Sequence, residues 1–325
     1  MKVAVAGLGF MGATHAAAWL KVPGAELAAV VSRDERKLTG DLTETGGNLG
    51  RQAARLDFSR TRKYRAIEEA LGDPEIDAID ICFPTDLHAR TAIAAVRSGK
   101  HALVEKPLAL TGEDADQVVF EAKRAGAVLM TAQVLRFMPA YVAAREKIQI
   151  LGPIRSAWFR RKCAAPVWSG WLREPARSGG GIFDLLIHDV DYARWLFGSP
   201  FTVRAYGIAD DARGLDLVTA QLVYDGWSAS ISGGWHLETA LPFSAEFTIV
   251  CEDGVLEYVS STEKLILYQP DTTAEVIPLP QIDPFVAELA HFQDCVSRGE
   301  SSPVCPPSES ADAVRLMRQI VAGRQ

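Results

Sequence analysis

The sequence lacks the features of a membrane, secreted or nucleic-acid-binding protein. No run approaches about eighteen consecutive apolar residues, the length that a membrane-spanning helix needs. The five cysteines stand far apart with no C-x-x-C pair, which excludes a disulfide framework and a structural zinc site of that type. No long run of Lys or Arg occurs and the net charge is −7, so no basic surface for nucleic acid is indicated. Met1 and Lys2 lead directly into an apolar strand pattern rather than a signal peptide. We therefore expect a cytoplasmic protein with no nucleic-acid or membrane partner.

Length and composition indicate a globular protein with two domains. Hydrophobic residues make up 48% of the sequence and charged residues 23%, an ordinary balance that argues against disorder. The 325 residues exceed the length of one average domain. A change in pattern near residue 125 predicts a first domain over 1–125 and a second over 126–325. The last predicted helix, 311–321, is expected to pack on the first domain.

The N-terminus carries a glycine-rich turn between a predicted strand over 2–6 and a predicted helix over 13–20. The turn has G-x-G-x-x-G spacing. In dinucleotide-binding folds the first glycine permits the tight turn, the second lets backbone approach a pyrophosphate, and the third allows close helix–strand packing. The N–H groups of the helix N-terminus then face the phosphates. The predicted cofactor-binding residues of this turn are Gly7, Gly9, Phe10, Met11 and Gly12.

The residues after the second predicted strand, 26–31, bear on the choice of cofactor. An acidic residue about 20 positions after the glycines binds the ribose 2′-hydroxyl of NAD, whereas an Arg there accommodates the 2′-phosphate of NADP. Here that position holds Ser32, followed by Arg33. A hydroxyl and a guanidinium suit a phosphate, which favours NADP. Asp34 comes next and would serve NAD if the register shifts by two, so NAD remains open.

Further apolar runs over 76–83, 101–104 and 127–131 alternate with helical patterns, which predicts a doubly wound parallel sheet of the Rossmann type. Ligands of such sheets bind beyond the carboxyl ends of the strands. Pro84, Thr85 and His88 follow one strand, and Glu105 and Lys106 end another, so we expect them near the glycine turn. Lys106 follows a buried run and precedes a proline that fixes the backbone, which favours a functional lysine over a surface charge.

The second half has a strand-rich pattern. Alternating runs cover 154–163 and 201–208, and two Asp-Gly pairs, Asp225-Gly226 and Asp253-Gly254, each separate two further alternating runs. Asp-Gly between such runs is a strong hairpin signal, so an antiparallel sheet is predicted.

A predicted helix ending at Gly198 carries Asp184, His188 and Asp191 at positions i, i+4 and i+7, hence on one face. Three interpretations compete. The polar groups form a buried hydrogen-bonded network, they bind a metal, or they perform acid–base catalysis. A metal site lacks a further ligand at suitable spacing, so none is predicted. A histidine that titrates near neutrality beside a carboxylate suits acid–base work.

Three motifs resemble the Gfo/Idh/MocA family of oxidoreductases: the glycine turn, the segment from Pro84 to His88, and the segment from Gly99 to Leu110 with its E-K-P sequence. The resemblance implies a Rossmann domain followed by an α+β domain with an open, mainly antiparallel sheet. It also implies hydride transfer between NADP or NAD and a sugar, polyol or related compound. The family's D-x-x-x-H helix matches Asp184 and His188, so Lys106, Asp184 and His188 are implied as the catalytic set.

In the implied oxidation, His188 removes the hydroxyl proton, Lys106 donates to the developing oxyanion and Asp184 positions its neighbours. Two alternatives stay open: the redox-neutral glycosidase chemistry of some relatives, and a cofactor-binding sensor without turnover. An exposed sheet face favours burial against another subunit, as a homodimer or homotetramer. The candidate substrate-binding residues, which core packing explains equally well, are Trp168, Trp171, Arg173, Asp191 and Tyr192.

Overall fold

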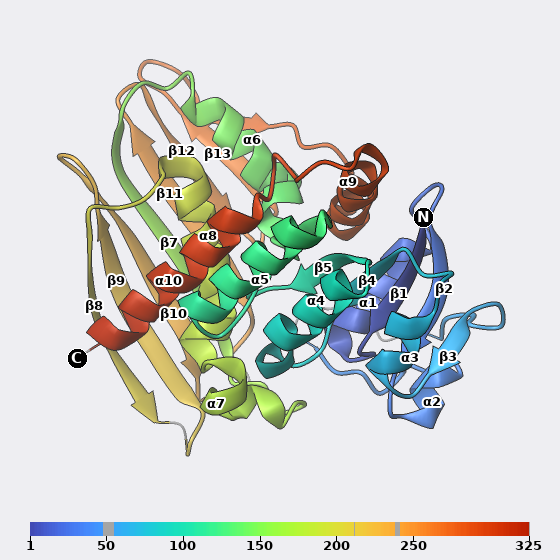
Figure 1. The fold of residues 1–325 in the computed structure, drawn as a ribbon. Helices are drawn as coiled ribbons and strands as arrows, with labels where there is room; N and C mark the ends of the chain where they lie inside the picture. Colours follow the sequence, from blue (N-terminus) through green and yellow to red (C-terminus); the bar gives the residue numbers. More distant parts are fainter. Residues whose placement is uncertain (48–54, 211, 238–240, 325) are drawn as a thin grey trace. The chain divides into compact units, whose positions relative to one another are not determined.

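The computed structural model describes residues 1–47, 55–210, 212–237 and 241–324 (Figure 1). The chain divides into two compact units. The first comprises Met1–Val134 and Asp283–Val314, and the second comprises Leu135–Ile282 and Arg315–Gln325. The division thus falls after Val134 rather than near residue 125, because Leu129–Ala132 forms the last strand of the first unit's sheet.

The first unit contains a six-stranded sheet in the order β3-β2-β1-β4-β5-β6. Every neighbouring pair is parallel, which confirms the predicted doubly wound sheet. Its central strands are buried because their residues are almost all apolar. The strands are β1 (Lys2–Ala6), β2 (Glu26–Val31), β3 (Arg62–Tyr64), β4 (Ala78–Ile81), β5 (His101–Glu105) and β6 (Leu129–Ala132).

Helices connect these strands, with α4 beside α5 and α1 beside α9. Helix α5 begins where the Thr111 hydroxyl accepts a hydrogen bond from the Asp114 N–H, and it ends at Gly126 in the left-handed conformation. The helices of the unit are α1 (Phe10–Trp19), α2 (Glu35–Leu38), α3 (Ile67–Gly72), α4 (His88–Arg97), α5 (Gly112–Ala125) and α9 (Pro284–Arg298), with the start of α10 (Pro307–Gly323).

The second unit contains an eight-stranded sheet in the order β14-β13-β12-β11-β7-β10-β9-β8. All neighbours are antiparallel except β7 and β10, and both Asp-Gly hairpins form as predicted, between β9 and β10 and between β11 and β12. The strands are β7 (Ile154–Ala164), β8 (Thr202–Asp210), β9 (Leu215–Val223), β10 (Ser228–His236), β11 (Ser244–Cys251), β12 (Gly254–Val259), β13 (Lys264–Tyr268) and β14 (Glu275–Ile277).

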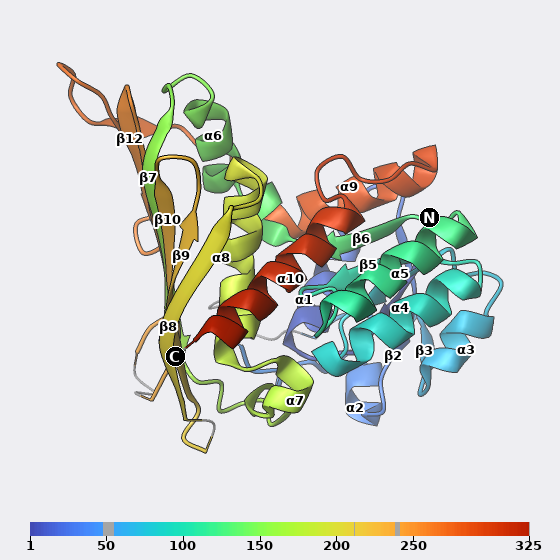
Figure 2. The same cartoon turned by 60° about the vertical axis from the view of Figure 1, so that its left-hand side comes forward.

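Helices α6 (Pro139–Ile148) and α8 (Gly181–Phe197) lie on one face of this sheet, as Figure 2 shows. The short helix α7 (Pro175–Ser178) precedes α8. Tyr141 of α6 and Tyr192 of α8 meet edge to face, with ring centroids 4.8 Å apart, in a core of aromatic side chains. No described helix combines the length and the apolar character that crossing a bilayer requires.

Two buried ion pairs attach α8 to its surroundings. Asp189 accepts hydrogen bonds from Arg161 of β7 at 2.8 and 3.0 Å, and Asp191 accepts two from Arg136 at 2.9 and 2.8 Å. All four side chains are buried. Two bidentate pairs formed by residues two positions apart, which point to different sides of the helix, fix both its position and its rotation.

Asp189→Asn should lower the free energy of unfolding by about 3–5 kcal/mol, because it leaves a buried guanidinium without a counter-charge. The matched control is Glu252→Gln, which removes an exposed ion pair with Arg155 and should leave stability nearly unchanged. Urea unfolding of both variants measures the difference. Equal losses in the two variants would contradict a structural role for the buried pair.

Candidate functional site

The glycine turn of the first unit is tightly packed at two of its glycines and open at the third. A Cβ on Gly7, whose φ is +97°, would lie 2.7 Å from the Cys82 carbonyl oxygen, and one on Gly12 would lie 1.7 Å from the Gly7 carbonyl oxygen. A Cβ on Gly9 would meet nothing within 4 Å. Only the absence of side chains at Gly7 and Gly12 lets α1 approach β1 and β4 so closely, whereas Gly9 leaves room for a ligand.

Helix α1 begins directly after Gly9, and no side chain of the described residues caps it. Its first N–H groups and its positive dipole end are therefore available to an anion. Phe10 and Met11 are half-buried in the first turn, and the Phe10 ring lies against Gly47. The arrangement fits the pyrophosphate of a dinucleotide.

Asp34 and Arg33, at the carboxyl end of β2, differ in how their side chains are engaged. The Asp34 carboxylate caps α2 by accepting hydrogen bonds from the N–H groups of Arg36 and Lys37, at 3.0 and 3.4 Å. The Ser32 hydroxyl accepts from the Asp34 N–H at 3.1 Å. Arg33 is exposed. The acidic residue is thus engaged in the helix cap, while the guanidinium remains in solvent.

Lys106 stands out at the end of β5. It is the one residue between Ala102 and Ala109 that is not buried. Its backbone N–H donates to the Glu105 carboxylate at 3.0 Å, and its peptide bond to Pro107 is cis. Because Glu105 is itself buried, it acts on the lysine backbone and not as a surface group.

His88 ties two loops of the first unit together. Its Nδ1 lies 2.7 Å from the Pro107 carbonyl oxygen and its Nε2 lies 2.7 Å from the Phe83 carbonyl oxygen. Burial lowers the pKa of His88. Thr85 is also buried, and Pro84 is half-buried beside it. Both ring nitrogens of His88 therefore face backbone carbonyls, and the side chain supports the loops after β4 and β5. We do not propose His88 as a cofactor contact.

Helix α8 of the second unit is mostly buried but leaves two polar side chains partly exposed. From Gly181 to Ala193, only Asp184 and His188 are partly exposed. They lie one turn apart, so both occupy the same face of the helix. The N-terminus of α8 is not open to an anion, because the Asp216 carboxylate accepts a hydrogen bond from the Ile182 N–H at 3.1 Å. An imidazole and a carboxylate side by side, reached by solvent, can move a proton.

The structure removes two of the predicted substrate contacts. Asp191 is buried in its ion pair with Arg136, and Tyr192 is fully buried with its hydroxyl donating to the Tyr141 carbonyl at 2.8 Å. The i+7 spacing did place Asp191 on the side of Asp184 and His188, but a partner 55 residues earlier in the chain occupies its carboxylate.

The segment before α8 retains the other candidates. Trp168 is 42% exposed, Trp171 is half-buried and Arg173 is exposed. Leu172, between them, packs against a small core of Cys163, Leu185 and Trp235. A packed residue therefore anchors a segment whose other side chains can contact a ligand.

Sequence reasoning missed a polar cluster inside the first unit, centred on His15 of α1. The ring Nδ1 lies 2.9 Å from Asp80 Oδ2, and the Trp19 indole donates to the same oxygen at 2.7 Å. Cys82 lies beside them, with its Sγ 3.6 Å from Nδ1. The atoms of His15, Asp80 and Cys82 that could bind a metal lie within 4.8 Å of one another. The 2.9 Å separation of His15 Nδ1 and Asp80 Oδ2 is, however, a hydrogen-bond length, so these two atoms bond to each other. The available signal was Asp80 itself, a charge inside an apolar strand.

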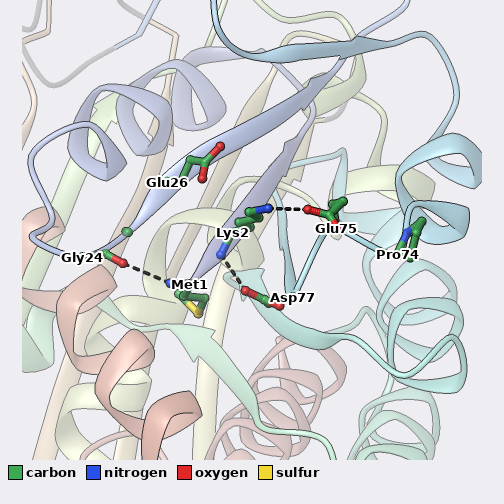
Figure 3. A pocket seen from close by; sticks show the side chains of 8 residues that line it. Met1, Lys2, Gly24, Glu26, Pro74, Glu75 and Asp77 are labelled. Carbon is green, nitrogen blue, oxygen red and sulfur yellow. Dashed lines mark hydrogen bonds and ion pairs between the residues drawn. The ribbon is translucent and has the colours of Figure 1, made fainter.

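A pocket lies elsewhere on the first unit, at the amino ends of β1 and β2 (Figure 3). Lys2 and Glu75 form an ion pair beside it, and the Lys2 N–H donates to Asp77 at 2.7 Å. Ligands of doubly wound sheets bind at the carboxyl ends of the strands, which is the opposite edge. The pocket is therefore not part of the candidate site.

Comparison with known proteins gives two family matches. Residues 1–133 match the oxidoreductase family with NAD-binding Rossmann fold, and residues 141–257 match the GFO/IDH/MocA C-terminal domain. A scyllo-inositol 2-dehydrogenase (NAD(+)) from Bacillus subtilis is 28% identical over 93% of this chain and 87% of its own length. A 1,5-anhydro-D-fructose reductase from Ensifer adhaerens is 34% identical, over 54% of this chain and only half of the relative.

The fold also resembles that of solved structures. A levoglucosan dehydrogenase in complex with NADH and levoglucosan superposes with a TM-score of 0.85. The match covers 99% of this chain and 96% of the other, at 20% identity. At that identity the likeness concerns the fold alone.

The glycine turn yields a prediction from paired variants. Gly9→Ala should leave thermal stability unchanged but raise the Kd for NADPH and NADH at least about tenfold, because its methyl group occupies the space left for pyrophosphate. Gly12→Ala should instead lower the free energy of unfolding by about 1–3 kcal/mol, as an overpacked contact does. Fluorescence titration and thermal melts measure both. Unaltered cofactor affinity in a folded Gly9→Ala variant would refute the assignment.

Proposed function

Because the chain belongs to the Gfo/Idh/MocA family of NAD-binding oxidoreductases, we propose that it transfers a hydride between a nicotinamide cofactor and a sugar, polyol or related hydroxy or keto compound. The observation that carries the proposal is the pair on α8, where Asp184 and His188 alone are partly exposed between Gly181 and Ala193. Relatives named as inositol and anhydrofructose enzymes support the substrate class.

Each proposed catalytic residue has a role that follows from its chemistry. His188 exchanges a proton with the substrate hydroxyl, because imidazole titrates near neutrality. Lys106 donates to the oxygen that develops negative charge. Asp184, one helical turn from His188, orients the imidazole. The bound nicotinamide supplies or accepts the hydride. Trp168, Trp171 and Arg173 are proposed substrate contacts.

We further propose that NADP is preferred over NAD. The support is that Asp34 is engaged in capping α2, while Ser32 and Arg33 remain to bind a 2′-phosphate. The Bacillus relative is named as an NAD(+) enzyme, so NAD is the alternative cofactor.

A homodimer or homotetramer in the cytoplasm is also proposed. Trp158, Tyr206 and Tyr268 lie on strands of the second sheet and are 49%, 65% and 40% exposed. Aromatic side chains of this kind are enriched in interfaces between subunits.

The cofactor proposal is tested by Arg33→Ala. We expect the Kd for NADPH to rise about 10- to 100-fold, the size of a lost charge-assisted contact, while the Kd for NADH changes little. The matched control is Arg60→Ala, another exposed arginine of the same unit, which should alter neither value. Tighter binding of NADH than NADPH by the unsubstituted protein would overturn the preference.

The catalytic proposal is tested by His188→Ala. Turnover should fall roughly 10²- to 10⁴-fold, the usual contribution of a general acid–base group, with cofactor affinity nearly unchanged. His291→Ala, on α9, serves as the histidine control. Steady-state kinetics with whichever substrate is active measures the effect. Near-normal turnover of His188→Ala would exclude the residue from the mechanism.

A further inference from the structure

His15 is completely buried between two carboxylates contributed by different strands. Its Nδ1 lies 2.9 and 3.1 Å from the two oxygens of Asp80, on β4, and its Nε2 lies 3.0 Å from Glu105 Oε1, at the end of β5. The contact with Asp80 is a hydrogen bond. The contact with Glu105 has ion-pair distance, but Nε2 makes no hydrogen bond to a described residue. Asp80 is fully buried and Glu105 nearly so.

Acceptors on both sides of the ring determine its protonation. A neutral imidazole has one N–H and one lone pair, so one of its nitrogens would direct a lone pair at a carboxylate. A doubly protonated ring directs no lone pair at either carboxylate, and its positive charge lies between their two negative charges. Burial opposes the charge, but the Asp80 carboxylate outweighs it and raises the pKa of His15 well above its ordinary value.

The other titratable groups facing His15 do not supply a competing charge. Cys82, after β4, has a thiol whose pKa burial raises strongly, so it stays neutral. Glu288, on α9, is fully buried, and neither of its oxygens has a hydrogen-bond partner among the described residues. Burial raises the pKa of Glu288 well above its ordinary value, so that carboxyl is protonated. His15 therefore provides the positive charge between Asp80 and Glu105.

Glu105 continues the connection to Lys106. One carboxylate oxygen faces His15, and the other accepts a hydrogen bond from the backbone N–H of Lys106 at 3.0 Å. The helix that follows the glycine turn is thereby joined, through one histidine and one carboxylate, to the backbone of the lysine. All these contacts lie within the first unit.

We propose that His15 is a positioning residue: fixed as an imidazolium between Asp80 and Glu105, it holds the Glu105–Lys106 backbone so that the lysine ammonium is correctly placed for hydride transfer. The inference rests on the proposed role of Lys106. A reacting group displaced by about 1 Å can lose about 10²-fold in rate, so a rigid support of this kind has a measurable effect.

The charge state of His15 is tested by NMR of the full chain labelled with ¹⁵N-histidine. The six histidines are distinguished by comparison with His15→Gln. Both ring nitrogens of His15 should remain protonated well above the pH of about 6.5 at which an exposed imidazole titrates. A neutral ring at pH 7 would overturn the proposal. This readout does not depend on activity, so it stands apart from the role of Lys106.

Action through Lys106 is tested by a double-mutant cycle. His15→Gln should lower kcat about 10- to 100-fold with little change in KM, and the same substitution in a Lys106→Met background should have almost no further effect. A purely structural role would give additive losses, and additivity overturns the proposal. If His15→Gln does not fold in thermal melts, Glu105→Gln replaces it in the cycle.

Two controls complete the experiment. Glu288→Gln replaces a neutral carboxyl with a neutral amide of the same shape and should leave kcat unchanged, and a loss of tenfold or more there would contradict the assigned charges. Lys123→Met, at an exposed site on α5, controls for loss of a lysine. Full turnover of Lys106→Met would refute the proposed role of Lys106 and with it the action of His15 through that lysine, whereas the NMR result would still report the charge state of His15.

Discussion

The close approach of α1 to β1 and β4 is the constraint on which the first unit depends. It exists because Gly7 and Gly12 carry no side chain, since a Cβ at either position would overlap a backbone carbonyl. The approach places the uncapped start of α1 at the carboxyl ends of the strands, where an anionic cofactor can bind. It also brings His15, on the same helix, within reach of Asp80 and Glu105. The proposed binding of a cofactor phosphate and the proposed support of Lys106 therefore share one structural cause.

In the second unit, buried ion pairs determine how helix α8 is placed. Helix α8 is held by buried ion pairs of Asp189 with Arg161 and of Asp191 with Arg136. Such pairs add little net stability over apolar packing, but breaking one is costly, so they specify a single arrangement of the helix. With that arrangement fixed, Asp184 and His188 are left partly exposed among buried neighbours. The structural carboxylates and the proposed catalytic carboxylate thus lie within two turns of one helix.

Local patterns predicted most of the fold but not the long-range polar contacts. Apolar runs and Asp-Gly turns are local patterns that span only a few residues. They predicted β1, β2 and both hairpins correctly. The partner of Asp191 lies 55 residues away, and the His15 contact with Asp80 spans 65. Spacing on one helix cannot reveal such partners, which is why Asp191 was predicted to bind substrate. The three-residue strand β3 was missed because it is short and polar.

The proposed reaction is net oxidation or reduction of a hydroxy or keto compound by a nicotinamide cofactor. A spectrophotometric screen of sugars and polyols against NADP⁺ and NAD⁺, with the purified full chain, tests it most directly. We expect reduced nicotinamide to accumulate with at least one sugar or polyol, and to accumulate faster with NADP⁺. Cleavage of a glycoside with no accumulation of reduced cofactor would contradict the claim and establish a redox-neutral reaction instead.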